Sequence, residues 1–180
     1  HGFDISVPVE YRVNDWFSVN SGLRWIMRSS GYRKSYSDAG GTFVADDYVK
    51  MHHAIEIPLT VRFSLPLDDF RLFIGGGGYI GVRTLDVDAG SSYLTASDAE
   101  ERGYWERYYQ HIAFEADDNL FDAGLIAEAG ASYEFGDYGS LYLLGRYQYG
   151  LTSLAKDSRM AAHSYFDSIS VDVGFMWRII

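Results

Sequence analysis

The chain contains no cysteine, and its 15 basic residues are outnumbered by 25 acidic ones, for a formal net charge of -10. The lack of cysteine excludes disulfides, thiolate metal sites and cysteine nucleophiles. The lack of a basic stripe argues against nucleic-acid binding, which depends on clustered Lys and Arg at phosphates. Long apolar runs are missing too, because no stretch approaches the roughly 18 uninterrupted apolar residues of a membrane-spanning helix.

Aromatic residues and glycine are in excess. Of the 180 residues, 15 are tyrosine and 19 are glycine, and 17% are aromatic, which is more than in ordinary proteins. This composition suits aromatic girdles and crowded strands. The length predicts a single domain, residues 1–180.

Seven stretches of the chain alternate apolar and polar residues. Between Tyr48 and Leu65, the odd positions from Val49 onwards are almost all apolar, whereas the even positions are mostly polar. A period of two is typical of a β-strand with two chemically different faces. The predicted strands are Gly2–Arg12, Trp16–Arg28, Tyr48–Leu65, Phe70–Arg83, Phe121–Phe135, Leu141–Thr152 and Tyr165–Ile180.

The connections between these strands alternate in length. Short turns and long connections follow one another over residues 13–15, 29–47, 66–69, 84–120, 136–140 and 153–164. Bacterial membrane barrels show the same asymmetry, with short periplasmic turns and longer extracellular loops. In the longest connection, Ser97 and Glu100 form a capping box that predicts a short helix.

Three features indicate that the apolar faces point outward into lipid. The opposite faces mix small residues with charges of both signs, which a narrow interior holds as a network. Aromatic residues such as Trp16, Phe63 and Trp177 gather near the short turns, where an interfacial girdle is expected. The third feature is the alternation of short and long connections between the strands. The sequence therefore predicts an all-β fold, a small antiparallel up-and-down transmembrane β-barrel in a bacterial outer membrane, in contact with its lipid and lipopolysaccharide.

The strand count predicts one more strand. Seven is one short of an even number, and even numbers are usual in bacterial single-chain barrels. An open edge inside lipid would leave backbone groups unsatisfied. We therefore expect eight strands, with the N-terminal strand missing from this sequence and either located upstream or supplied by another chain. The start at His1, without an initiator Met or a signal peptide, is typical of a mature or truncated product.

Charged residues on the polar faces are candidates for an interior network. A pore lining or a proton pathway is one interpretation of these charges, but the narrow bore of an eight-stranded barrel favours a salt-bridge network that plugs the interior. The members are Glu10, Arg24, Arg28, Glu56, Arg62, Glu128, Arg146, Asp172 and Arg178.

Two motifs resemble chemical sites but lack the partners that such sites need. The run from Gly75 to Gly78 is not followed by the Lys and Ser or Thr of a phosphate loop, so it predicts a bend in a crowded strand. His52 and His53 are neighbours on a strand and face opposite ways, so they cannot chelate one ion together. No serine at strand spacing completes a nucleophile. We therefore expect no catalytic residue, metal or cofactor.

The longest connection is the best candidate for function. It contains an aromatic cluster of Tyr104, Trp105, Tyr108 and Tyr109. Loops carry function on rigid scaffolds, and Tyr and Trp are common interface anchors. The cluster predicts a partner-binding loop, with packing of that loop over the barrel mouth as the alternative.

Several motifs, taken in order, resemble a known family. The strand Glu56-Ile57-Pro58-Leu59, the run from Phe70 to Gly81 and the strand Arg146-Tyr147-x-Tyr149-Gly150-Leu151 resemble the PorT-like outer-membrane β-barrel family of Bacteroidota. The resemblance runs from about Gly2 to the C-terminus. It implies an eight-stranded barrel, and some members of the family are linked to type IX secretion or gliding machinery.

Three functions are compatible with these observations. The first is a non-enzymatic structural or accessory subunit of a larger outer-membrane complex for secretion, assembly or transport, with protein partners. The second is a lipid-modifying enzyme that uses His53, and the third is a stand-alone structural barrel. Fold alone does not decide among them.

Overall fold

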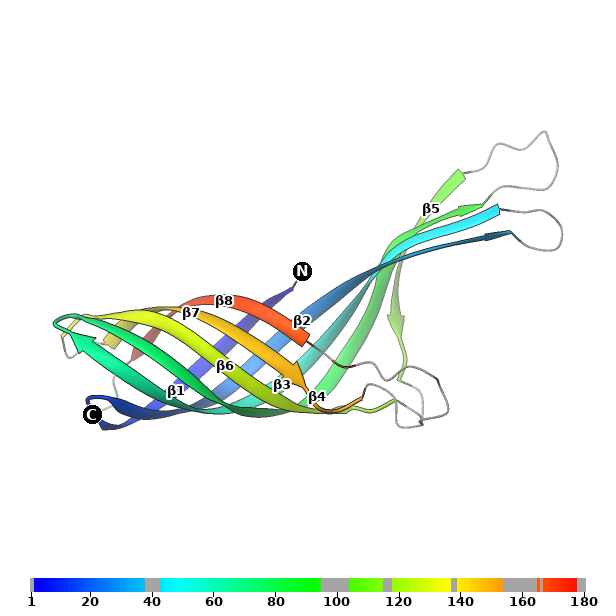
Figure 1. Ribbon diagram of the computed structural model, residues 1–180. Helices are drawn as coiled ribbons and strands as arrows, with labels where there is room; N and C mark the ends of the chain where they lie inside the picture. Colours follow the sequence, from blue (N-terminus) through cyan, green and yellow to red (C-terminus); the bar gives the residue numbers. More distant parts are fainter. Residues whose placement is uncertain are drawn as a thin grey trace.

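The computed structural model shows one antiparallel sheet that curls into a barrel (Figure 1). It describes residues 2–37, 43–94, 104–114, 118–136, 139–153, 165 and 167–177. The strands are β1 (Phe3–Asn14), β2 (Phe17–Ser37), β3 (Phe43–Leu67), β4 (Phe70–Leu94), β5 (Tyr104–Ile112), β6 (Phe121–Glu134), β7 (Gly139–Gly150) and β8 (Asp167–Trp177). In the described part of the chain, no helix is long and apolar enough to span a membrane.

The barrel wall follows the chain. Its order is β1-β2-β3-β4-β6-β7-β8, and every neighbouring pair is antiparallel. These seven strands correspond to the seven predicted ones, so the antiparallel up-and-down architecture is confirmed. The eighth strand of the structure is β5, which pairs with β4 off this path. It is not the N-terminal strand that we expected, and that strand stays a prediction.

Burial alternates along the strands, with a polarity opposite to that of a soluble protein. Arg24, Glu56 and Gln148 are each 1% exposed. Ile5 and Ile74, on the outer face, are 64% and 65% exposed. Such a surface would be unfavourable in water, and buried charges need partners. In lipid the same arrangement is favourable, because the apolar side chains cover the outside of the wall.

Aromatic rings gather at the end of the barrel that carries the short turns. Trp16 stacks on Phe63 with 6.1 Å between ring centroids, and Phe70 meets Tyr133 edge-on at 4.8 Å. These four residues lie where the sequence pattern places an interfacial girdle. Amphipathic and aromatic rings are favoured at that depth of a membrane.

At the opposite end, strands continue beyond the barrel wall (Figure 1). The last pair between β4 and β6 is Val82 with Phe121, whereas β5 first pairs with β4 at Asp86 and Ile112. The pairing of β3 with β4 shifts register between His53 and Ala54, at the same level. Bulges bend strands and increase their twist. The outer extension, defined as residues 29–37, 43–52, 86–94 and 104–112, leaves the barrel there.

The extension corrects two boundaries predicted from the sequence. Residues 29–47 and 84–120 were expected to form loops, but β2 continues to Ser37, β3 starts at Phe43, β4 continues to Leu94, and β5 forms a further strand. Beyond the membrane neither face of a strand has to be apolar, so the alternation that marks a strand weakens. The capping box at Ser97 and Glu100 lies outside the described residues.

The glycines from Gly75 to Gly78 alternate between the inner and the outer face of β4. On the side of the interior, a Cβ at Gly75 would lie 2.7 Å from the carbonyl oxygen of Val61 and 3.2 Å from Cγ of Glu128. At Gly76 the nearest atom, the carbonyl oxygen of Ile126, would be 3.4 Å away. Gly75 therefore leaves room for the charged side chains of the interior.

We expect Gly75→Ala to lower the free energy of unfolding by about 1–3 kcal/mol, because backbone and buried side chains must shift. Gly76→Ala is the matched control on the same strand and should change it by less than about 0.5 kcal/mol. Urea unfolding in detergent micelles, followed by tryptophan fluorescence, measures both. Equal losses would contradict the assignment of Gly75 to a crowded interior position.

Candidate functional site

A first interior cluster surrounds Glu56. Gln148 Nε2 donates a hydrogen bond to its carboxylate at 3.1 Å, Arg28 forms a salt bridge with it, and Arg24 Nη1 lies 3.6 Å away. Arg24 also reaches Asp4 Oδ2 at 2.7 Å, and Arg28 reaches Asp122 Oδ2 at 3.0 Å. The cluster therefore joins β1, β2, β3, β6 and β7 across the barrel axis.

A second cluster surrounds Glu128. Its carboxylate accepts hydrogen bonds from Arg62 Nε at 2.5 Å and from the Thr60 hydroxyl at 3.0 Å. Arg146 lies 3.5 Å from Glu128 and 3.2 Å from Asp172 Oδ2. Charges that are buried in this way are held by several partners each, as a low-dielectric interior requires.

A third cluster lies close to the short turns. Glu10 accepts hydrogen bonds from Ser18 Oγ at 2.9 Å and from Arg12 Nε at 3.1 Å. Arg12 and Arg71 both pair with Glu134, at 2.8 and 3.1 Å. This cluster links β1, β2, β4 and β6 beneath the aromatic girdle.

The structure brings the sequence-predicted interior residues together, although Arg178 lies outside the described part of the chain. Further members were not in the predicted set, namely Asp4, Arg12, Arg71, Asp122, Glu134 and Gln148. All of them occupy polar-face positions, so strand alternation was a sufficient signal for including them.

The space between the two main clusters is small. A cavity of about 30 Å³ lies between the Glu56 and Glu128 clusters, bordered by residues that include Asn20, Arg24 and Arg146. That volume holds about one or two water molecules. Salt bridges that cross the bore from wall to wall act as a plug, and they favour a structural role for these charges.

The two histidines face opposite ways. The His53 ring stacks on Trp25 with 5.3 Å between centroids, on the outer face. His52 faces inward, with Nδ1 2.9 Å from Asp86 Oδ1. Among the described residues, no three His, Cys, Asp or Glu side chains are placed to hold a metal ion.

One side of the outer extension continues the barrel interior, and a row of residues crosses its four strands there. The row is Tyr32, Tyr48, Gly90 and Tyr108. Tyr32 stacks on Tyr48 with 5.3 Å between centroids. Burial raises the pKa of the Tyr108 hydroxyl, and the carboxylates of Asp46 and Asp88 raise it further, so this hydroxyl remains a hydrogen-bond donor.

The opposite side of the extension presents exposed aromatic rings. Trp105 is 57% exposed and Tyr109 is 64% exposed. Tyr93 packs against Trp105 with 5.1 Å between centroids, and this contact supports the indole ring from the neighbouring strand. Val49 on β3 faces the same way and is 39% exposed.

The aromatic cluster predicted from the sequence is therefore divided. Trp105 and Tyr109 share one face and Tyr108 lies on the other, because these residues belong to a strand and not to a loop. Tyr104 begins β5, but its side chain lies outside the described residues.

A known family matches most of the chain. The sequence model of the family described as Outer membrane protein beta-barrel domain matches residues 1–156, which include β1 to β7. The chain belongs to this family. No curated protein and no solved structure matches the chain. This outer membrane β-barrel therefore resides in the bacterial outer membrane, with its apolar outer face in lipid.

Two ion pairs of the barrel offer a direct comparison. Arg62→Met should lower the free energy of unfolding by about 3–5 kcal/mol, because Glu128 is left buried with fewer partners. Arg33 pairs with Asp47 at 2.8 Å, but these side chains are 82% and 51% exposed. Arg33→Met should therefore leave the free energy of unfolding almost unchanged, because water screens an exposed ion pair. If urea unfolding in micelles gave similar losses, the network would not stabilise the barrel as described.

Orientation can be measured with single cysteines, because the chain has none of its own. We expect Ser35→Cys, exposed on the outer extension, to react with a membrane-impermeant maleimide on intact cells. Asp69→Cys, in the short turn after β3, should react only after the outer membrane is permeabilised. The reverse pattern would invert the orientation.

Proposed function

We propose that this barrel is a non-enzymatic structural or accessory subunit of a larger outer-membrane complex for secretion, assembly or transport. The observation that carries this proposal is the outer extension, in which β2, β3 and β4 continue beyond the barrel wall and β5 joins them. The extension presents Trp105 and Tyr109 to the outside. The partner is a protein that binds this aromatic face, and outer-membrane lipid and lipopolysaccharide surround the wall below it.

The form of the extension supports a role in protein binding. Tyr and Trp contribute large contact areas with little conformational freedom to lose, and they are enriched among residues that dominate binding energy. A sheet holds these rings more rigidly than a loop does, so less entropy is lost when a partner binds. Within the described residues, β5 pairs only with β4, and its second edge offers backbone groups to a partner.

The interior and the histidines support a non-enzymatic role. The Glu56 and Glu128 clusters cross the bore, and such a plug disfavours the passage of ions or substrates. His53 lies on the outer face against Trp25, and His52 is engaged by Asp86 on the inner face. A lipid-modifying enzyme would need a nucleophile beside one of them. No cofactor takes part in the proposed function.

We further propose that the barrel is a PorT-like protein of Bacteroidota. The motifs Glu56-Ile57-Pro58-Leu59 and Arg146-Tyr147-x-Tyr149-Gly150-Leu151 support this narrower assignment. Their polar members lie inside the barrel, where Glu56 belongs to the first interior cluster and Arg146 to the second. A place in secretion or gliding machinery is what the resemblance implies.

Copurification tests the proposed function. The tagged barrel, extracted in mild detergent, should migrate on a native gel as part of a larger complex. Replacing both Trp105 and Tyr109 with Ala should weaken retention of the partner by on the order of thirtyfold, the effect of losing a strong interface anchor. Tyr11→Ala, at a 70% exposed position of β1 on the barrel wall, is the matched control and should retain the partner.

Two outcomes would contradict the proposal. A single monodisperse species without a partner would instead indicate a stand-alone structural barrel. Lipid turnover that disappears in His53→Ala, with the folded barrel retained, would indicate an enzyme. Each variant is first checked for folding by the shift in electrophoretic mobility on heating.

A further inference from the structure

The outer extension has two edges. Its strands lie in the order β2, β3, β4 and β5, and the pairing of β1 with β2 ends below it, at Phe3 and Met27. In the described part of the chain, residues 29–37 of β2 and the whole of β5 therefore have one neighbouring strand each. About half of the backbone N–H and C=O groups of an edge strand point away from its neighbour. An edge of this kind is a template for a further strand.

The two edges differ in composition. Residues 29–37 of β2 include four serines, a glycine and the adjacent cations Arg33 and Lys34. Gly and Lys are disfavoured in strands, and exposed Lys discourages pairing at an edge. In β5, by contrast, Tyr, Trp and Ile occupy five of the nine positions, Gly, Pro and Lys are absent, and the ladder with β4 has no register shift. The edge of β5 is therefore the better acceptor of a strand.

Charged side chains on the other strands of the extension form pairs across neighbouring strands. Arg33 of β2 pairs with Asp47 of β3 at 2.8 Å, and Lys50 of β3 lies 3.9 Å from Asp88 of β4. Opposite charges on adjacent strands stabilise a sheet, whereas like charges directly opposite each other destabilise it. Within the described residues, every strand of the extension except β5 takes part in such a pair.

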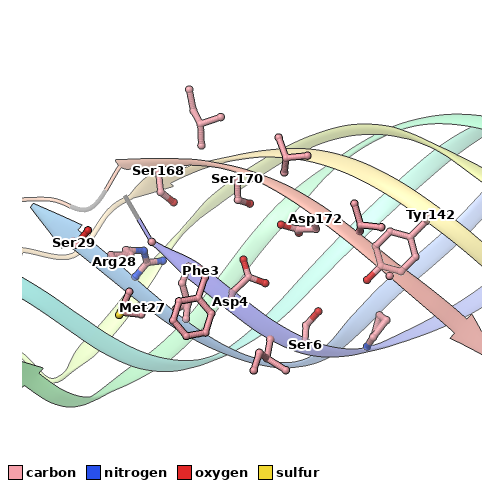
Figure 2. A pocket seen from close by; sticks show the side chains of 18 of the residues that line it. Phe3, Asp4, Ser6, Met27, Arg28, Ser29, Tyr142, Ser168, Ser170 and Asp172 are labelled. Atoms are coloured by element: carbon pink, nitrogen blue, oxygen red, sulfur yellow. The ribbon is translucent and has the colours of Figure 1, made fainter.

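The edge strands of the barrel wall also have compensated charges. Asp4 of β1 reaches Arg24 at 2.7 Å, and Asp172 of β8 reaches Arg146 at 3.2 Å. Figure 2 shows both carboxylates beside a cavity of about 800 Å³ that residues of β1 and β8 line. The two arginines belong to the adjoining strands β2 and β7, so these edge charges are neutralised within the wall.

The edge of β5 carries charges of another kind. Arg107 and Glu106 are exposed, and neither has an ion-pair partner among the described residues. Their neighbours on β4 are Ser91 and Ser92, and the Ser92 hydroxyl already donates a hydrogen bond to Asp46 at 2.6 Å. Consecutive residues of a strand lie on opposite sides of the sheet. A cross-strand partner for each charge therefore has its place on the open side of β5.

We propose that a partner protein adds an extended strand to the open edge of β5, with an acidic residue beside Arg107 and, next to it, a basic residue beside Glu106. This inference rests on the proposed function, because it takes the partner at the extension to be a protein. It adds the mode of binding and the chemistry of the bound segment. In such complexes main-chain hydrogen bonds supply affinity, and alternate side chains supply specificity.

The side chains of β5 specify five consecutive positions of the added strand. Residues directly opposite each other have Cβ atoms about 4.5–5.5 Å apart, so each position is matched to one residue of β5. Trp105 and Tyr109 are exposed rings that apolar or aromatic residues would cover. From Trp105 to Tyr109, the opposite residues are therefore apolar, basic, acidic, unrestricted and apolar. A parallel segment has this order from its N-terminus, and an antiparallel segment has the reverse order.

Photo-crosslinking of the whole protein in its native membrane tests the mode of binding. A benzophenone amino acid replaces Gln110 or His111, which are exposed on opposite sides of β5. Both probes should crosslink to one partner, at neighbouring residues of a single segment, as mapped by mass spectrometry. The matched controls are the same probe at Lys34 and at Ser35, on the edge of β2, and neither should reach that segment.

The outcomes separate this inference from the proposed function. Crosslinks from His111 without any from Gln110 would indicate a partner on one face only, which overturns strand addition and leaves the proposed function standing. Crosslinks from both probes to the same polypeptide would show that the chain covers its own edge, and a copurifying partner that neither probe reaches would also overturn strand addition. Copurification without any partner would contradict the proposed function itself.

A charge reversal tests the chemistry of the segment. Arg107→Glu should weaken retention of the copurifying partner by on the order of tenfold, because it places a like charge beside the acidic residue. Arg33→Glu is the matched control, in the same row and on the same face of the sheet but at the edge of β2, and should retain the partner. Equal losses, or full retention by Arg107→Glu, would overturn the charge assignment. Heat-modifiable mobility confirms that both variants are folded.

Discussion

Every backbone N–H and C=O group that lies in hydrocarbon must find its hydrogen-bond partner within the protein, and the architecture of this barrel follows from that requirement. It explains why each strand of the wall is hydrogen-bonded to the next, from the β1–β2 pair to the β7–β8 pair. Among the described residues no ladder joins β1 and β8, so these two strands are the edges of the wall.

Once the wall is built, side chains divide between two solvents. The apolar side chains of each strand face lipid. The alternate side chains, among them Arg24, Glu56 and Glu128, therefore point into a bore that is too narrow for bulk water. Each charge is then held by partners from several strands, as Glu56 is by Arg24, Arg28 and Gln148. Such a network cross-links the wall and occupies the path that a pore would need. The charged interior of this barrel is therefore a consequence of lipid on the outside and does not indicate transport through the centre.

The surfaces that remain available to partners lie where the strands leave the lipid. β4 pairs with β6 as far as Val82 and with β5 from Asp86 onwards. At the same level, the register shift beside His53 bends the sheet away from the barrel. Beyond this level the strands are in water and both faces are available. Trp105 and Tyr109 remain exposed on one face, supported by Tyr93, while the Tyr32, Tyr48 and Tyr108 row occupies the other. The wall positions this surface outside the membrane, and the plugged interior stiffens its base.

The sequence by itself determined the seven wall strands, their antiparallel order and the face of each strand that meets lipid. Alternate residues of a strand face opposite sides, and because one side is lipid and the other is the polar interior, the alternation of apolar and polar residues indicates the side that each residue faces. It also placed Glu56 and Glu128 in the interior, although it did not show which arginines they meet. Outside the membrane the period carries less information, so the sequence missed the outer part of β4 and all of β5 and treated the aromatic residues as one loop cluster. Only the tertiary structure decided that Trp105 and Tyr108 face opposite ways and that both Arg62 and Arg146 reach Glu128. It also decided that Asp4 and Asp172, from β1 and β8, line one cavity. These relations depend on strand register and barrel curvature, which bring together residues far apart in the chain and leave no trace in local alternation.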